Sequence, residues 1–145
     1  MKKILLILII FLSFAQASLA SDISFAIPKN INTGDTFEVM VNADTGGVLI
    51  NSIDMTINYP ADLLTFSGYK DDDAVIKFWI ETPHEVAEKN DGKISFKGIV
   101  PGGVLGLYDA RKGGLSPIPV VRLLFTAKSA GTANISFENT EILKN

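Results

Sequence analysis

The ionisable side chains of this chain offer little material for catalysis. Its 145 residues include one histidine, His84, and no cysteine. Nucleophilic catalysis usually needs a serine or cysteine activated by a histidine that a third group orients. With one histidine and no thiol, we expect neither a Ser-His-Asp nor a Cys-His arrangement in its ordinary form. We predict that the chain is not an enzyme.

Two acidic clusters are the remaining candidates for chemistry. Glu81, Glu85, Glu88 and Asp91 fall in one segment, and two carboxylates can act as the acid and base of a glycosidase when their separation in space is suitable. Asp71-Asp72-Asp73 supplies oxygen atoms of the kind that bind calcium, but the ligand spacing of an EF-hand loop is absent. We interpret both clusters as solvated loops and expect no metal ion and no cofactor.

A third group of polar side chains lies on a regular strand. Apolar and polar residues alternate strictly from Ile53 to Tyr59, with Ser52, Asp54 and Thr56 on the polar side. Successive side chains of a strand face opposite sides of the sheet, so one face is in the core and the other is in water. A face with small polar groups and one carboxylate suits recognition of a partner. The alternative interpretation is an ordinary solvated face.

Residues 1–20 have the composition of a secretory signal peptide. Lys2 and Lys3 precede an apolar run from Ile4 to Leu12, and Ser18-Leu19-Ala20 supplies small residues at a cleavage site. This run is shorter than the roughly 20 apolar residues of a transmembrane helix. We predict an exported protein, extracellular or on the cell surface, with one domain over residues 21–145 and no membrane insertion after cleavage.

The charge and the absence of cysteine restrict the function further. Removal of Lys2 and Lys3 reduces the 13 basic residues to 11, against 16 acidic residues. An acidic surface argues against nucleic acid and against anionic membranes as partners. Without cysteine there is no disulfide framework. The fold must therefore be stabilised by its apolar core.

The exported part of the chain consists of short alternating segments separated by turns. A short helical turn is expected from Pro83 to Lys89, a tight hairpin at Asn90-Asp91-Gly92, and an irregular glycine-rich segment from Pro101 to Pro119. Strands at a spacing of about ten residues, with turn signals between them, indicate an all-β sandwich. The expected strands cover residues 23–27, 37–41, 52–59, 63–69, 76–80, 94–100, 120–127 and 135–142.

The alternation in the two long strands predicts which side chains are buried. In the late strand we expect Val120, Arg122, Leu124 and Thr126 to point outward. Two packed antiparallel sheets should enclose the apolar sides of both strands. The side chains predicted to lie between the sheets are Ile53, Met55, Ile57, Tyr59, Leu123 and Phe125.

Three segments, in the order of the chain, resemble cohesin domains. Thr33-Gly34-Asp35-Thr36, followed by the alternating residues 37–41, resembles the glycine-aspartate turn and second strand of that family. Residues 53–66 are similar to the third cohesin strand and the leucine pair that follows it. Residues 121–127 with Ala130-Gly131-Thr132 resemble the late strand and glycine turn that close the domain. Together the segments span nearly the whole exported chain.

The resemblance implies a fold and a partner. The implied fold is a nine-stranded jelly-roll β-sandwich of two antiparallel sheets, and the implied function is a non-catalytic module that binds a dockerin. In that family the pairing assembles polysaccharide-degrading enzymes or attaches proteins to a cell surface. The family contacts on the third strand fall on Ser52 and Asp54. This chain departs from the family at Tyr59-Pro60-Ala61, which replaces Tyr-Asp-Pro, and over residues 76–90, which cannot be aligned.

A single surface patch is predicted as the binding site. It combines outward residues of the third strand with those of the strands after the hairpin and near the end of the chain. We expect Asp54 to matter most, because a carboxylate in an interface accepts charge-assisted hydrogen bonds. The predicted partner-binding residues are Ser52, Asp54, Thr56, Lys97, Ile99, Arg122 and Leu124.

Two other functions compete with protein binding. A carbohydrate-binding module of the same sandwich type would bind polysaccharide on coplanar exposed aromatic rings, drawn here from Trp79, Tyr69 and Tyr108. Since Phe78 and Trp79 are adjacent, one of them should face inward and the other outward. The third alternative is a structural domain of a larger surface protein.

Overall fold

A computed structural model describes residues 22–86 and 91–144. The predicted signal peptide, residues 1–20, lies outside the described residues. Within them no helix is long and apolar enough to span a membrane. The strands are β1 (Asp22–Ala26), β2 (Thr36–Asp44), β3 (Ile50–Asn58), β4 (Leu64–Lys70), β5 (Phe78–Glu85), β6 (Lys93–Val104), β7 (Leu107–Asp109), β8 (Gly114–Ser116), β9 (Ile118–Ala127) and β10 (Ser136–Lys144).

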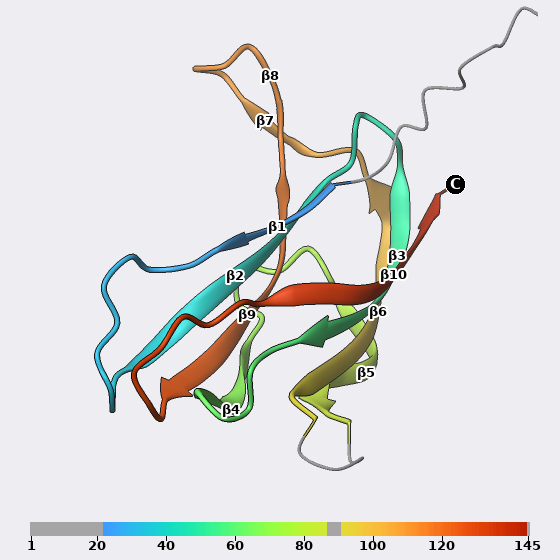
Figure 1. Cartoon of the computed structure of the whole chain (residues 1–145). Helices are drawn as coiled ribbons and strands as arrows, with labels where there is room; N and C mark the ends of the chain where they lie inside the picture. Colours follow the sequence, from blue (N-terminus) through green and yellow to red (C-terminus); the bar gives the residue numbers. More distant parts are fainter. Residues whose placement is uncertain (1–21, 87–90, 145) are drawn as a thin grey trace, which may run out of the picture.

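Eight of these strands form two antiparallel four-stranded sheets. Sheet A has the order β1-β2-β9-β4, and sheet B has the order β10-β3-β6-β5. The strands β7 and β8 pair only with each other and form a hairpin that projects from the body of the sandwich (Figure 1). The predicted all-β sandwich of two antiparallel sheets is confirmed.

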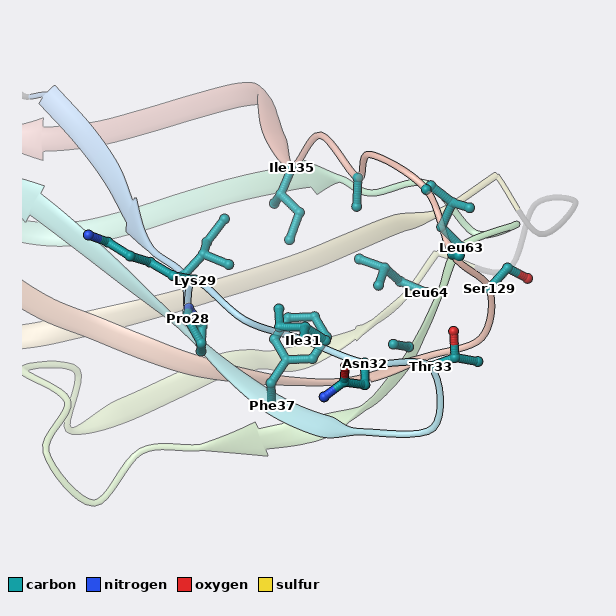
Figure 2. Close-up of a pocket in the computed structure, with 15 residues that line it drawn as sticks. Pro28, Lys29, Ile31, Asn32, Thr33, Phe37, Leu63, Leu64, Ser129 and Ile135 are labelled. Atoms are coloured by element: carbon teal, nitrogen blue, oxygen red, sulfur yellow. The ribbon is translucent and has the colours of Figure 1, made fainter.

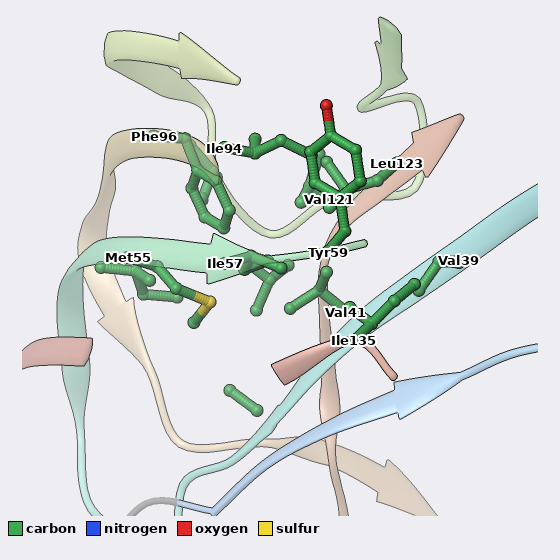
Figure 3. Close-up of a cluster of buried hydrophobic side chains, with 14 of the residues drawn as sticks. Val39, Val41, Met55, Ile57, Tyr59, Ile94, Phe96, Val121, Leu123 and Ile135 are labelled. Carbon is green, nitrogen blue, oxygen red and sulfur yellow. The ribbon is translucent and has the colours of Figure 1, made fainter. Parts of the chain in front are cut away.

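The apolar faces of the two sheets pack together to form the core. Met55, Ile57, Ile94 and Phe96 of sheet B face Val39, Val41, Val121 and Leu123 of sheet A (Figure 3). Burial of such a side chain contributes roughly 1.5–3 kcal/mol to stability. All six side chains predicted to lie between the sheets are buried, at 5% exposure for Tyr59 and 0% for the others: Ile53, Met55, Ile57, Tyr59, Leu123 and Phe125.

The end of β3 is held by the turn that precedes β6. Tyr59 donates its backbone N–H to the carbonyl oxygen of Gly92 over 2.7 Å, and Pro60, which has no N–H, follows the strand. Gly92 has φ +64°, and a Cβ atom there would lie 1.9 Å from the carbonyl oxygen of Tyr59. Only glycine fits this close approach. β5 and β6 pair antiparallel on either side of the predicted hairpin, and Asn90 of the predicted turn lies outside the described residues.

The number of strands differs from the nine that the cohesin resemblance implies. The described residues form ten, and two of them, β7 and β8, lie in the segment from Pro101 to Pro119 that we expected to be irregular. Its first residues extend β6 to Val104, and its middle forms the β7–β8 hairpin. Positive φ angles at Gly106 and Gly113 allow the sharp changes of direction before and within that hairpin.

The segment around β5 also differs from the sequence prediction. The predicted helical turn from Pro83 to Lys89 is wrong over its described part, because residues 83–85 continue β5. The strand begins at Phe78 rather than at Ile76, and register shifts interrupt its pairing with β6. These irregularities hide the period of two that identifies a strand in the sequence.

One outward assignment in β9 is wrong. Val120 is fully buried, together with its neighbour Val121. Val41 of β2 pairs with Val121, and the next residue, Asn42, pairs with Pro119. Val120 is therefore the extra residue of a β-bulge, where the alternation of side chains is interrupted.

Candidate protein-binding face

Five of the seven predicted site residues lie together on the outer face of sheet B. In the register of β3 and β6, Ser52 is opposite Ile99, Asp54 is opposite Lys97, and Thr56 is opposite Ser95. Directly opposite residues of an antiparallel pair project from the same face of the sheet. The buried residues that alternate with them confirm that this face points away from the core.

The other two predicted residues lie elsewhere, and the single patch is wrong in this respect. Arg122 and Leu124 belong to β9, which is in sheet A between β2 and β4. They project from the outer face of sheet A, on the opposite side of the sandwich from Asp54. Alternation shows that a side chain points outward, but it does not show which sheet the strand joins.

A row that is apolar on three of the four strands crosses sheet B, and we call it the apolar row. Leu143 of β10 is opposite Ser52, which is opposite Ile99, which is opposite Phe78 of β5. The exposed fractions are 64% for Phe78, 51% for Leu143 and 38% for Ile99, and nearby Ile80 is 59% exposed. Exposed apolar side chains gathered on one face are typical of an interaction site.

A charged row lies directly beside the apolar row. It runs from Glu141 of β10 through Asp54 and Lys97 to Glu81 of β5. Lys97 Nζ donates to Asp54 Oδ2 over 2.8 Å. This hydrogen bond and the charge of Asp54 raise the pKa of the Lys97 ammonium, and the charges of Glu141 and Glu81 act in the same direction. Three carboxylates thus surround one ammonium, which leaves the row negative.

A third row is polar and nearly neutral. Asn139, Thr56, Ser95 and His84 are aligned across the four strands. His84 Nε2 lies 3.1 Å from Glu81 Oε1, which links this row to the charged one. The outer face of sheet B therefore changes from apolar to negative to polar along the strands.

The outer face of sheet A is different, because its polar groups bind one another. Arg122 lies against Asp73 and within 3.6 Å of Glu38 Oε2, and Lys70 also pairs with Glu38. The hydrogen bond from Lys70 lowers the pKa of the Glu38 carboxyl. Hydroxyl groups beside this cluster bond across the strands, from Thr36 to Thr126 at 3.2 Å and from Thr126 to Ser67 at 3.0 Å. The charged and hydroxyl groups named here therefore have partners within the chain.

The sequence prediction missed the residues that β5 and β10 contribute to the face of sheet B. Glu141 and Leu143 alternate with half-buried Ile142, and this period of two was a usable signal. Phe78 and Glu81 carry no such signal, because a register shift lies between Trp79 and Glu81.

The acidic clusters considered for chemistry serve structural contacts. Asp71 accepts a hydrogen bond from Trp79 Nε1 over 2.7 Å, and Asp73 pairs with Arg122. Glu81 is opposite outward-facing Lys97, whereas Glu85 is opposite inward-facing Ile94. Glu85 accepts a hydrogen bond from the hydroxyl group of Tyr59. Glu88 lies outside the described residues. Over the described part of the chain, no group of three or more histidine and acidic side chains is arranged to hold a metal ion.

The three aromatic side chains proposed for sugar stacking do not share one flat surface. The Trp79 ring is half-buried and meets Tyr69 edge-on at 65° and Phe96 at 81°. Of the adjacent pair, Trp79 therefore faces inward and Phe78 outward, as alternation predicts. Tyr108 is exposed but lies on the β7–β8 hairpin. The three rings proposed for stacking are not coplanar on one surface.

A cavity of about 570 Å³ lies at one end of the sandwich, apart from the face of sheet B. It opens between the β1–β2 connection and the β9–β10 connection (Figure 2). Its lining includes apolar side chains at the edge of the core, among them Phe37, Leu64 and Ile135. The Lys29 side chain is directed away from the other lining residues (Figure 2). Three polar side chains, Asn32, Thr33 and Ser129, also line it.

Comparison with known proteins identifies the fold. No family model and no curated protein sequence matches the chain. Among solved structures, a cohesin module from a family 33 glycoside hydrolase of Clostridium perfringens is similar, with a TM-score of 0.61 and 8% identity over 86% of this chain and 83% of that one. The sixth cohesin of Acetivibrio cellulolyticus scaffoldin B, in complex with a dockerin, has a TM-score of 0.61 and 17% identity, covering 86% of each chain. A type I cohesin–dockerin complex from Clostridium thermocellum gives a TM-score of 0.56 and 18% identity, covering 83% of each chain.

These likenesses confirm the resemblance drawn from the sequence. The chain has a cohesin-like β-sandwich fold, and several of the similar cohesins were solved in complex with dockerins.

Proposed function

We propose that the protein is a secreted, non-catalytic, cohesin-like module that binds a dockerin-type protein through the outer face of sheet B. Its role would be to assemble polysaccharide-degrading proteins or to attach a protein to the cell surface. The observation that carries the proposal is the contrast between the two outer faces. Sheet B exposes an apolar row beside a negative one, whereas the charges of sheet A pair with one another.

The fold and the charge of the face support the same function. Cohesins that share this fold have been solved in complex with dockerins. An interface needs exposed apolar groups at its centre and polar groups around them. The rows through Ile99 and Asp54 offer both on the two central strands of sheet B, which are the best-supported part of the sheet.

Two matched substitutions test which face binds. Ile99→Arg and Leu124→Arg each place a cation on an outward aliphatic position of a central strand, one in sheet B and the other in sheet A. Binding would be measured by calorimetry against dockerin modules encoded by the same organism. We expect Ile99→Arg to abolish binding and Leu124→Arg to leave it unchanged.

Two results would contradict the proposal. If Leu124→Arg abolished binding and Ile99→Arg did not, the binding face would be on sheet A. If no dockerin bound the wild-type protein, the partner class would be wrong.

Export is tested separately from binding. Mass spectrometry of the protein from the culture medium should find Ser21 as the first residue. An uncleaved chain retained in the cell would contradict the proposed secretion.

A further inference from the structure

The β7–β8 hairpin projects from the sandwich and complements the outer face of sheet B. We propose that two copies of this protein associate by exchanging these hairpins, so that the hairpin of each copy lies on the outer face of sheet B of the other. Its apolar pair, Tyr108 and Leu115, contacts the apolar row, and its basic tip, Arg111-Lys112, contacts the charged row. This self-association goes beyond the proposed function and shares only the face with it.

The hairpin exposes apolar side chains on both of its strands. Tyr108 is directly opposite Leu115, so both project from one face of the hairpin. Their exposed fractions are 72% and 51%, and Leu105 and Leu107 beside them are also exposed. A two-stranded hairpin is only marginally stable in water unless it packs against another element. An apolar surface on a second copy would cover side chains that the described sandwich leaves in water.

The hairpin is nevertheless fixed at its base and closed at its tip. At the base, the buried Thr45 hydroxyl donates a hydrogen bond to the carbonyl oxygen of Leu105. At the tip, the carbonyl oxygen of Asp109 accepts the backbone N–H of Lys112 at 3.1 Å and that of Gly113 at 2.9 Å. A segment that is ordered before binding loses less conformational freedom on binding. The hairpin is therefore suited to insert as a preformed element.

The hairpin tip has the sign of charge that the outer face of sheet B lacks. The Arg111 side chain is 94% exposed, and its Nε lies 3.6 Å from Asp109 Oδ1. The Lys112 ammonium makes no hydrogen bond or ion pair with any other described residue. On the face, three carboxylates surround the ammonium of Lys97. Complementary charges of this kind attract the two surfaces and fix how they align.

The spacing within the hairpin matches the spacing between the two rows. Arg111 is three residues beyond Tyr108, which is at most about 10 Å along the chain and less across the turn. The apolar and charged rows are two residues apart along β3 and β6, or roughly 6.7 Å. A hairpin lying along these strands therefore places Tyr108 over the apolar row while its tip reaches the charged row.

The apolar row lies near the end of the sandwich from which the hairpin projects. Ile99 is five residues before Val104, the end of β6, or roughly 16 Å. Arg111 is seven residues beyond Val104, or at most about 23 Å. Two copies placed end to end can therefore reach the rows of one another, with a two-fold axis between them. Such a contact uses the same surfaces twice and closes at two copies.

The number of residues involved is that of a stable interface. Each copy would contribute the 12 residues of its hairpin, 105–116, and the eight residues of its apolar and charged rows. A standard protein interface has roughly 20–30 residues on each side. Hairpin exchange therefore buries enough surface for a dimer, whereas one hairpin on one face would bury half as much.

Sedimentation at increasing protein concentration tests the association. We expect the wild type to change from monomer to dimer as the concentration rises. Arg111→Glu with Lys112→Glu should weaken the dimer at least tenfold, because like charges then face each other. Lys29→Glu with Lys128→Glu changes the net charge equally outside the hairpin and the rows, and the dimer should remain. A wild-type protein that stays monomeric up to about 1 mM, where only very weak association escapes detection, would overturn the inference.

A charge exchange between two variants tests which surfaces are in contact. Glu81→Lys with Glu141→Lys makes the face positive and should also weaken the dimer. Mixing this face variant with the Arg111→Glu, Lys112→Glu variant should restore association as a mixed dimer, because each hairpin then meets a face of opposite charge. A mixture that associates no better than either variant alone would overturn the inference. Tyr108→Ser with Leu115→Ser should weaken the dimer without a change of charge, and an unchanged dimer would contradict the role of the apolar pair.

The outcome is separable from that of the proposed function. If the charge exchange restores a dimer but no dockerin binds, self-association stands and the dockerin assignment is wrong. If a dockerin binds through Ile99 while the wild type stays monomeric, the proposed function stands and the hairpin exchange is overturned. If both occur, the Arg111→Glu, Lys112→Glu variant should bind the dockerin more tightly than the dimeric wild type, because no second copy occupies the face. Equal apparent affinities would overturn the exchange.

Discussion

Replacement of Ile57 by alanine tests the packing on which the binding face depends. Ile57 is fully buried on β3, which is held on both sides by β10 and β6. The substitution removes three carbon atoms, and their transfer to water accounts for about 2.4 kcal/mol at roughly 0.8 kcal/mol per group. The ladders on both sides of β3 limit collapse into the space, so a cavity term adds to this loss. We expect a total of about 3–5 kcal/mol, a large part of the stability of an ordinary domain.

Urea unfolding followed by the fluorescence of Trp79 measures this change. Trp79 is the single tryptophan and packs against Phe96, so its emission reports on the core. The matched control is Thr56→Ala on the adjacent outward position, which we expect to cost less than about 1 kcal/mol. A loss below about 1 kcal/mol for Ile57→Ala, or a larger loss for Thr56→Ala, would show that the side chains of β3 are assigned to the wrong faces.

Three further substitutions test separate features. Gly92→Ala should destabilise the protein by more than about 2 kcal/mol in urea unfolding, because it combines a positive φ with a clash against the Tyr59 carbonyl. The control is Gly102→Ala, where φ is also positive but the space around the residue is open. This control should reduce the stability clearly less. Burial, together with the hydrogen bond to Glu85, raises the pKa of the Tyr59 hydroxyl above its ordinary value. This group therefore stabilises the fold below about pH 10, where the tyrosine of the unfolded chain is protonated. The stabilisation is lost as the pH rises further, because the unfolded tyrosine then ionises more readily than the folded one. Tyr59→Phe should flatten the alkaline fall in melting temperature, and an unchanged slope would contradict this. Asp54→Ala should weaken dockerin binding by about 2–5 kcal/mol. The melting temperature should change little, since an exposed ion pair such as Asp54–Lys97 contributes little to stability. Unchanged affinity would remove Asp54 from the site.

The two outer faces explain why outward polarity alone is a poor guide to a binding site. Arg122 is as polar and as regularly placed as Lys97, yet it is enclosed by carboxylates of its own chain. Lys97 is also paired, but it is the one cation among three carboxylates, whereas the three carboxylates around Arg122 have Lys70 as a second cation. The balance of charge around a residue depends on neighbours from other strands. A partner is expected where one sign of charge is in excess and apolar side chains are exposed beside it.

The sequence by itself determined the fold class and which side chains of β3 face the core. The alternation in β3 correctly separated Ile53, Met55 and Ile57 from Ser52, Asp54 and Thr56, because a period of two is a property of the single strand. The positive φ at Gly92 was also predictable, since it depends on the local residue type. The likeness to cohesins, drawn from three short segments, agreed with the structural comparison.

Only the tertiary structure decided which outward faces lie together. The sheet that β9 joins depends on its pairing with β2 and β4, and this pairing carries Arg122 and Leu124 away from Asp54. The bulge at Val120 and the register shifts in β5 arise from the fit between partner strands, which no single segment encodes. The rows that join Phe78 to Leu143 consist of residues far apart in the chain, and they become neighbours because four strands align across sheet B.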